Sequence, residues 1–512
     1  MGISLMAAAV ASVVAEHLGY RLPTIIWGYN LTRTAGEMNL VQPLGWIIAY
    51  LGEITAVVLF LAGAWLLLSK LTSGPPNPVT LRKVARFRSI KRGYYSFLIL
   101  LALAGFAALD QLVVGKEALA VKYDESWTFP AFTTKLEKNK DFGLTGEDEK
   151  DLEPNYRELK EKEGYTVILP LRPYDPTQDT VSALGRPIEP GKSGYNGLGT
   201  RLFDSEKPEE PHLRFTYRKG RRQGTAQGWD QDGNRIYQAD YDEGQLVEGS
   251  VNWTGEGEVE DFLALSNEQE YDVSYPPSEP QWRFPLGTTP RGDDVLAYLY
   301  AGLQVNFKAA LIFIPIIYVI GISVGLLMGF FGGWFDLVVQ RIIEVLANIP
   351  FLFLVIIVTL GVPPQYKDRL GFYLIVLLLA AFGWMGMTNL MRTAALKEKA
   401  RDYIAASRVI GSGVTRILFR HLLPNTVAIL VTLVPFSISG LILALTSLDY
   451  LGFVPSDLAS WGKLLKDGLD SLSSPWLVSA AFVSLVTLLV LVTFVGEAVR
   501  EAFDPKKYTY YR

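Results

Sequence analysis

The sequence predicts an α-helical, polytopic membrane protein that carries one large polar insert. Seven apolar runs are long enough to cross a bilayer, whereas residues 116–291 are polar and contain no run of that length. The chain has 512 residues, of which 49% are hydrophobic and 20% are charged. Its mean hydropathy of +0.21 is therefore the average of very apolar stretches and one very polar stretch.

Charge and cysteine content exclude several classes of protein. A formal net charge of -4 and a pI near 5.7 argue against a nucleic-acid partner, since such a protein normally carries a basic excess. The chain has no cysteine, which excludes disulfides, iron–sulfur clusters, thiol catalysis and cysteine-type zinc sites. The histidines, at 17, 212 and 421, are scattered. We therefore expect no metal site, no cofactor and no catalytic residue.

The apolar runs have the length that a transmembrane helix needs, which is about 20 residues for a hydrocarbon core about 30 Å thick. They cover residues 46–68, 94–114, 309–331, 345–362, 370–391, 426–448 and 476–495. A buried core helix would explain one or two such runs but not seven. An eighth run, residues 3–15, is short for a span and lacks the basic start of a signal peptide; a weak transmembrane helix and an interfacial helix both remain open.

Basic residues predict the orientation, because Lys and Arg in short flanking loops stay on the cytoplasmic side. Six of them lie in residues 82–92, and seven more lie in residues 392–421 against two acids. Four predicted spans separate these stretches, and an even number returns the chain to the same side. We expect residues 116–291 to be external and the C-terminal tail, with Arg500, Lys506 and Lys507, to be cytoplasmic.

Charges near span ends are expected to anchor the helices, because long side chains reach the interface at little cost. These residues are Asp110, Lys308, Arg341, Glu344 and Glu497, and Arg341 and Glu344 are spaced to pair on one helix face. Glu53 lies inside the first run.

The insert contains an internal repeat with a period of 24 residues. Tyr217, Gly220, Trp229 and Gly233 recur as Tyr241, Gly244, Trp253 and Gly257. Turn glycines between short alternating runs predict β-hairpins, similar to a MORN-type repeat. A docking surface or lid for a soluble partner and a decoration without a transport role both remain open. Residues 185–193 look like a phosphate-binding loop, but five residues separate the glycines instead of four.

The loop between the runs that begin at residues 370 and 426 has a distinctive pattern. We expect a short helix over residues 402–410 with small or aliphatic residues on one side, so that a partner surface can approach closely. Gly411 can adopt positive φ and end that helix. Pro424 is expected in the first turn of the next span, where its missing N–H costs little.

This loop resembles the EAA loop of binding-protein-dependent ABC importer permeases. Ala406 and Ser407 take the two small positions, Gly411 the glycine, and Leu423 with Pro424 the closing pair, while Ala405 stands where the family has glutamate. Residues 286–295 resemble the Leu-Gly-Thr-Asp segment of peptide and nickel importer permeases, except that Thr289 replaces the acid and Asp293 falls where arginine is common. Residues 447–453 and 460–465 resemble the loop before the family's last span.

The resemblance covers about residues 82–508. Within the family, the chain most resembles the oligopeptide branch that includes microcin C uptake permeases. The resemblance implies a six-helix permease core in a bacterial cytoplasmic membrane. The resulting division is an N-terminal extension at 1–80 with one or two transmembrane helices, a basic segment and first core helix at 81–115, the external insert at 116–291, and the remaining core at 292–512 with the coupling loop at 401–425.

The resemblance implies a transport subunit that is not itself an enzyme. Its expected partners are a second homologous permease subunit, two ATP-binding subunits or domains, an extracytoplasmic solute-binding protein, a peptide substrate and the lipid bilayer. The residues expected to couple it to the ATPase are Asp402, Ala405, Ala406, Ser407, Gly411, Arg420, Leu423 and Pro424. A self-contained secondary transporter and a membrane-anchored receptor built around the external insert are the alternatives.

Overall fold

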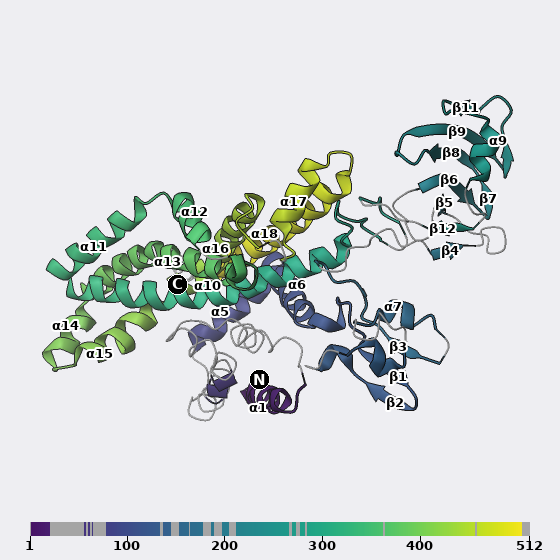
Figure 1. Cartoon of the computed structure of the whole chain (residues 1–512). Coiled ribbons are helices and arrows are strands. Elements are labelled where there is room, and N and C mark those ends of the chain that lie inside the picture. The colour runs from purple at the N-terminus through teal and green to yellow at the C-terminus, as the bar shows by residue number, and fades with distance from the viewer. Residues whose placement is uncertain are drawn as a thin grey trace. The chain divides into compact units, whose positions relative to one another are not determined.

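The computed structural model describes residues 2–20, 56–57, 60–61, 64, 78–133, 137–144, 153–162, 164–177, 186–188, 197–203, 211–265, 269–272, 277–281, 284–361, 364–455 and 458–503 (Figure 1). The chain divides into two compact units. The first comprises Met1–Thr177, Ala297–Asp470 and Val478–Arg512, and the second comprises Gln178–Leu296 and Ser471–Leu477. Within the described residues, four helices are long and apolar enough to cross a membrane, or six spans if each of two bent helix pairs counts as one.

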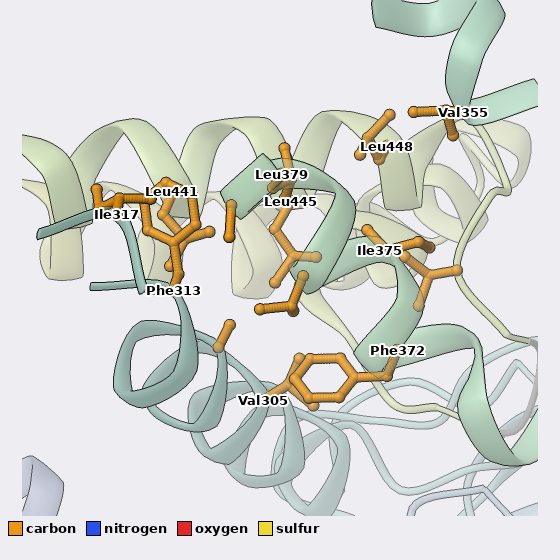
Figure 2. Packing of buried hydrophobic residues seen from close by; sticks show 14 residues of the cluster. Val305, Phe313, Ile317, Val355, Phe372, Ile375, Leu379, Leu441, Leu445 and Leu448 are labelled. Atoms are coloured by element: carbon orange, nitrogen blue, oxygen red, sulfur yellow. The ribbon is translucent and has the colours of Figure 1, made fainter. Parts of the chain in front are cut away.

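The four long helices are α10 (Val295–Phe331), α13 (Pro364–Lys399), α16 (Leu423–Tyr450) and α18 (Pro475–Phe503). Side chains of α10, α13 and α16 interlock with Val355 of α12 (Phe351–Gly361) in a buried cluster (Figure 2). Because α10 has 37 residues, it is about 55 Å long and extends beyond the predicted apolar run at 309–331.

The sequence predicted one continuous helix at residues 345–362. In the structure this run is instead part of a bent pair of helices. Helix α11 (Gly333–Ala347) and α12 meet at an angle of 74°. Pro350 explains the break, because it disfavours helical backbone at Ile349 and cannot donate a backbone hydrogen bond.

The bent pair nevertheless runs antiparallel along α13. Asp336 of α11 bonds Arg392 of α13, and Phe351 of α12 contacts Phe382 at a ring-centroid distance of 5.8 Å. Val355, further along α12, packs in the cluster that contains Phe372 and Ile375 of α13 (Figure 2). As residue numbers rise along the pair, those of its partners fall, which is the order expected if the pair crosses the bilayer once.

The run at residues 94–114 is also shorter than predicted. Helix α6 (Lys91–Ala107) ends well before residue 114 and is followed by the 3-10 turn Asp110–Leu112. Helix α5 (Pro78–Ser89) is basic and meets α6 at 95°. Two ion pairs, Arg86 with Glu501 and Arg92 with Glu497, join this corner to the C-terminal end of α18. The basic segment and the end of the last helix are therefore neighbours.

Smaller elements complete the first unit. Helix α1 (Gly2–His17) has 16 residues, about 24 Å, which is shorter than a bilayer core. The predicted span at 46–68 lies largely outside the described residues. Helix α17 (Trp461–Asp470) packs beside α16.

The first unit also contains a small antiparallel sheet in the order β2-β1-β3. Its strands are Ser126–Thr128, Ala120–Tyr123 and Thr166–Ile168. Helix α7 (Tyr156–Leu159) and two 3-10 turns, Pro130–Phe132 and Asn139–Phe142, are nearby in sequence.

The second unit is built on an antiparallel sheet in the order β10-β9-β8-β6-β5-β12-β4, with β11 paired to β9 and β7 paired to β6. In chain order the strands are Arg186–Ile188, Gly197–Leu202, Pro211–Arg218, Arg221–Arg222, Gly224–Trp229, Arg235–Asp242, Gln245–Leu246, Asn252–Trp253 and Glu270–Asp272. Phe262 of helix α9 (Val259–Ala264) packs in the core formed by β6, β8 and β9.

The residues of the 24-residue repeat lie in strands and turns of this sheet. Tyr217 and Tyr241 occupy β6 and β9, and Trp229 and Trp253 occupy β8 and β11. The four repeat glycines all have positive φ: 79° at Gly220, 92° at Gly244, 82° at Gly233 and 88° at Gly257. The period of 24 residues thus reflects two successive strand–turn–strand units in one sheet, with glycines where the turns need left-handed backbone.

Candidate functional site

The candidate site is the segment that joins α13 to α16. Helix α14 (Asp402–Val409) lies within it, as predicted, and Arg401 precedes it in extended backbone. The Arg401 guanidinium donates to Glu398 Oε1 at 3.0 Å, which fixes the turn out of α13. Asp402 lies in the first turn of the helix and Arg408 in the last, the charge order that the helix dipole favours.

One face of α14 packs on the bundle and the other is exposed. Ile404 is fully buried and Ser407 is only 9% exposed; these residues are three apart and so share a face. Ile404 packs with Leu326 of α10 and Met391 of α13. Asp402, Ala405 and Ala406 are exposed. Of the small residues expected to meet a partner, Ser407 therefore faces the protein's own core, and Ala405 and Ala406 remain available.

The end of α14 is closed by a capping motif that depends on Gly411. Ser412 N donates to Ser407 O at 3.0 Å, and Gly411 N donates to Arg408 O at 2.9 Å. These two bonds define a Schellman motif, whose residue after the cap takes left-handed backbone. Gly411 has φ of 82°, and a Cβ added there would meet no atom within 4 Å. The constraint at Gly411 is thus one of backbone angle and not of space.

Pro424 lies in the first turn of α16, as the sequence predicted, but α16 continues a helical backbone that starts earlier in the chain. Helical backbone begins at α15 (Val414–Arg416) and continues through a π-helical segment, Ile417–Leu422, into α16. A proline inside a helix cannot donate the usual bond and its ring crowds the preceding turn, and the wider π turn accommodates it. Arg420 and Pro424 are exposed, and Leu423 is half-buried against the core.

Tyr403 joins three helices at this site. Its hydroxyl donates to Glu398 Oε2 of α13 at 2.8 Å and accepts a bond from Asn425 Nδ2 of α16, also at 2.8 Å. Burial, with a contribution from the Glu398 carboxylate, raises the pKa of Tyr403 above its ordinary value, so the hydroxyl keeps its proton at neutral pH. Sequence reasoning assigned no role to Tyr403 or Asn425, because partners 22 residues apart give no local pattern.

The core beneath the site is held by close contacts between α10 and α13. Gly321, Gly325 and Gly329 recur every fourth residue, and a Cβ added at each would lie 2.6 Å from the Cβ of Met387, Met391 or Ala395. Small residues at this spacing let two membrane helices approach closely. Arg392 on α13 also forms a two-bond ion pair with Asp336, at 2.5 and 2.6 Å. The bundle end that carries α14 is therefore tightly joined.

Two large apolar side chains project beside Gly411. Val409 is 89% exposed and Ile410 is 83% exposed, although both belong to a basic loop. Neighbouring exposed apolar residues mark an interaction surface more often than a single exposed apolar residue does. Sequence reasoning missed them; the available signal was an apolar pair directly before a capping glycine.

The segment at residues 286–295, in the second unit, contains two of the three departures from the family resemblance. Thr289 and Asp293 are both fully buried. Thr289 Oγ1 donates to Asp293 Oδ2 at 2.9 Å, and Asp293 N donates to Thr289 Oγ1 at 3.1 Å. Arg291 Nη2 lies 3.3 Å from the same carboxylate oxygen. The two substituted positions are thus direct partners.

Comparisons with known proteins give matches that cover the segment joining α13 to α16. The family model described as binding-protein-dependent transport system inner membrane component matches residues 321–507, which include the whole of α14 and its flanking helices. The inner membrane ABC transporter permease protein YejE of Escherichia coli K12 is 30% identical over 433 residues, which cover 84% of this chain and 98% of that protein.

Two further relatives match a shorter part of the chain. The peptidoglycan transport system permease protein YejE of Agrobacterium fabrum is 38% identical over 223 residues, 43% of this chain and 57% of that protein. The oligopeptide transport system permease protein OppC of Mycobacterium tuberculosis (strain CDC 1551) is 34% identical over 233 residues, 45% of this chain and 77% of that protein.

Proposed function

Because the chain belongs to the binding-protein-dependent transport system inner membrane components, we propose that it is the permease subunit of an ABC importer for peptides or related solutes. It is a multi-pass inner-membrane protein of the transport class. ATP hydrolysis takes place on partner subunits, and this chain contributes part of the pathway through the membrane. The observation that carries the proposal is α14, a short helix fixed to the bundle on one face and exposed on the other.

We propose that the exposed face of α14 is the surface that contacts the ATPase. Ala405 and Ala406 give a low profile that a groove can approach, and Val409 and Ile410 supply apolar area at the helix end. The exposed members of the predicted coupling residues are Asp402, Ala405, Ala406, Gly411, Arg420 and Pro424, and Val409 and Ile410 extend their surface. Ser407 and Leu423 act from within the core.

The contacts of α14 support transmission of movement into the membrane. Ile404 packs against α10 and α13, and Tyr403 bonds both α13 and α16. A helix held by three spans cannot shift alone, so displacement by a closing ATPase dimer moves the ends of all three. Such rigid coupling suits a change between inward- and outward-facing states.

The basic residues and the order of the helices support one orientation. The corner of α5 and α6 and the C-terminal end of α18 lie together, and α11 with α12 runs antiparallel along α13. We therefore propose that residues 82–92 and the α14 segment are cytoplasmic and that residues 116–291 are external, where a solute-binding protein delivers substrate. A second, homologous permease completes the pathway.

The alternatives have less support. A secondary transporter would move protons or sodium on charges of its own, yet Asp336 is engaged by Arg392, and Arg341 by Glu344. A receptor built on the external insert has no need of α14. The relatives are named as permeases of transport systems, which favours the importer.

Thiol labelling tests the proposed surface, because the chain has no cysteine of its own. A single Ala406→Cys variant should react with a maleimide when the full chain is purified alone, and should be protected when the ATPase subunits encoded with it are bound. Ser407→Cys is the matched control. Ser407 is the next residue but faces the core, so a cysteine there should react slowly in both states. Equal labelling of Ala406→Cys with and without the ATPase contradicts the proposal, as does failure of any ATPase subunit to copurify.

A further inference from the structure

A small cavity beside the end of α6 carries opposite charges on its wall. Its volume is about 130 Å³, and its lining includes Asp110, Gln304, Lys308 and Tyr373. Gln304 Nε2 donates to Asp110 Oδ1 at 2.8 Å and to Ala107 O at 2.9 Å, which fixes the carboxylate beside α10. Among the described residues, no hydrogen bond or ion pair engages the Lys308 ammonium group. The cavity therefore presents one positioned anion and one available cation.

The lining residues follow a fixed order along α10. Gln304, with Asp110 bonded to it, comes first; Lys308 lies one turn further on, and Leu311 and Ile312 lie in the turn after that. At 1.5 Å per residue, each step is about 5 to 6 Å along the helix. The charge-free run of α10 starts at residue 309, so the membrane core is on the Leu311 side. Passing inward, the wall is negative, then positive, then apolar.

This order matches one class of membrane molecule. In a phospholipid that carries an amine, the ammonium group is outermost, the phosphate is deeper and the acyl chains follow. We propose that the cavity binds the head group of an amine-bearing, zwitterionic phospholipid, with its ammonium at Asp110, its phosphate at Lys308 and an acyl chain along Leu311. Charge-assisted bonds to both groups stabilise such a pair, and pockets with cations between membrane helices bind lipid head groups.

Two local features support a built site. Leu311 is 68% exposed, so the cavity opens onto apolar surface of the kind that acyl chains cover. Asp110 has φ of 45°, a left-handed angle that is uncommon outside glycine. This backbone turn directly follows α6 and brings the Asp110 carboxylate to Gln304. Simple anchoring of each charge at the interface would require neither the turn nor the shared cavity.

Lipid binding to the full chain tests the proposal. The protein is delipidated in detergent and titrated with phosphatidylethanolamine or phosphatidylglycerol, and bound lipid is counted by native mass spectrometry. Wild type should bind phosphatidylethanolamine more tightly than phosphatidylglycerol, which lacks the ammonium. Lys308→Met should weaken both lipids by about five- to tenfold, because both lose the phosphate partner. Asp110→Asn should weaken phosphatidylethanolamine alone, and Asn tolerates the left-handed angle.

The control is Lys466→Met, which removes an exposed cation of α17 outside the cavity and should leave both affinities unchanged. The proposal is overturned if Lys308→Met binds both lipids as wild type does, or if Asp110→Asn keeps the full preference for phosphatidylethanolamine. It is also overturned if wild type shows no preference, or if a short zwitterionic peptide displaces the lipid and is itself lost in both variants, which would identify a peptide site.

Discussion

The hydroxyl of Thr289 donates to the carboxylate of Asp293 across 2.9 Å in a site where both residues are fully buried. Each residue departs from the pattern that the family resemblance led us to expect, an acid at 289 and an arginine at 293. A change at one position alone would leave a buried polar group short of a partner, which is costly. In this chain the two departures are partners in one polar contact.

We expect Thr289→Val to lower the stability of the full chain by about 1 to 3 kcal/mol, because it removes a donor from a buried carboxylate without changing side-chain shape. Thr289→Ser keeps the hydroxyl and should stay near wild type. Thr225→Val is the control, since Thr225 donates to Asp240 on an exposed surface and should change stability by less than about 0.5 kcal/mol. Thermal unfolding in detergent measures all three, and equal losses at Thr289 and Thr225 would contradict the argument.

The cap of α14 predicts a specific order among substitutions at Gly411. Gly411→Ala should reduce peptide uptake, because a left-handed angle costs a residue with a Cβ about 1 to 2 kcal/mol, whereas Gly411→Asn should retain most activity since Asn accepts that angle. Gly413→Ala is the control, because Gly413 has φ of -64° and open space around it. Uptake is measured together with membrane insertion, so that a folding defect is recognised.

Gly411 and Tyr403 show which features of the site the sequence alone can predict and which it cannot. Gly411 and α14 were predictable because capping and helix formation depend on neighbouring residues. The break between α11 and α12 had a local signal in Pro350 that the hydropathy of the run outweighed. The bonds of Tyr403 to Glu398 and Asn425 were not predictable, because they depend on how three separate helices pack. The inward position of Ser407 was likewise decided by α10 and α13.

Close packing of α10 on α13 predicts opposite effects for two identical substitutions. Gly325→Ala should destabilise the protein by about 1 to 3 kcal/mol through overpacking, since a Cβ there would lie 2.6 Å from both Met391 Cβ and Thr388 O. Gly386→Ala, in α13, meets nothing within 4 Å and should stabilise by up to about 1 kcal/mol through helix propensity. Thermal unfolding of the two variants in one detergent provides the measurement, and similar shifts in both would show that the contact does not govern stability.

Acid sensitivity of the second unit is expected from His212. Its ring lies between those of Phe203 and Phe262, with centroid distances of 4.5 and 4.4 Å, and this burial lowers the pKa of His212 to about 4. An unfolded histidine has a pKa near 6.5, so between these values the unfolded state binds the proton more readily. The contribution to stability is therefore complete above pH ~6.5 and falls by at most about 1.4 kcal/mol per pH unit as the pH drops toward 4.

His212→Phe removes this titration while keeping an aromatic ring in the core, so the difference in stability between wild type and variant should change with pH over that interval. Limited proteolysis of the full chain, monitored by cleavage within residues 211–265, measures this difference in stability from pH 4.5 to 7.5. His17→Gln changes an exposed histidine and should leave the pH profile as in wild type. A wild-type profile parallel to that of His212→Phe would mean that His212 is protonated as readily in the folded sheet as in the unfolded chain, against the burial that its two aromatic neighbours impose.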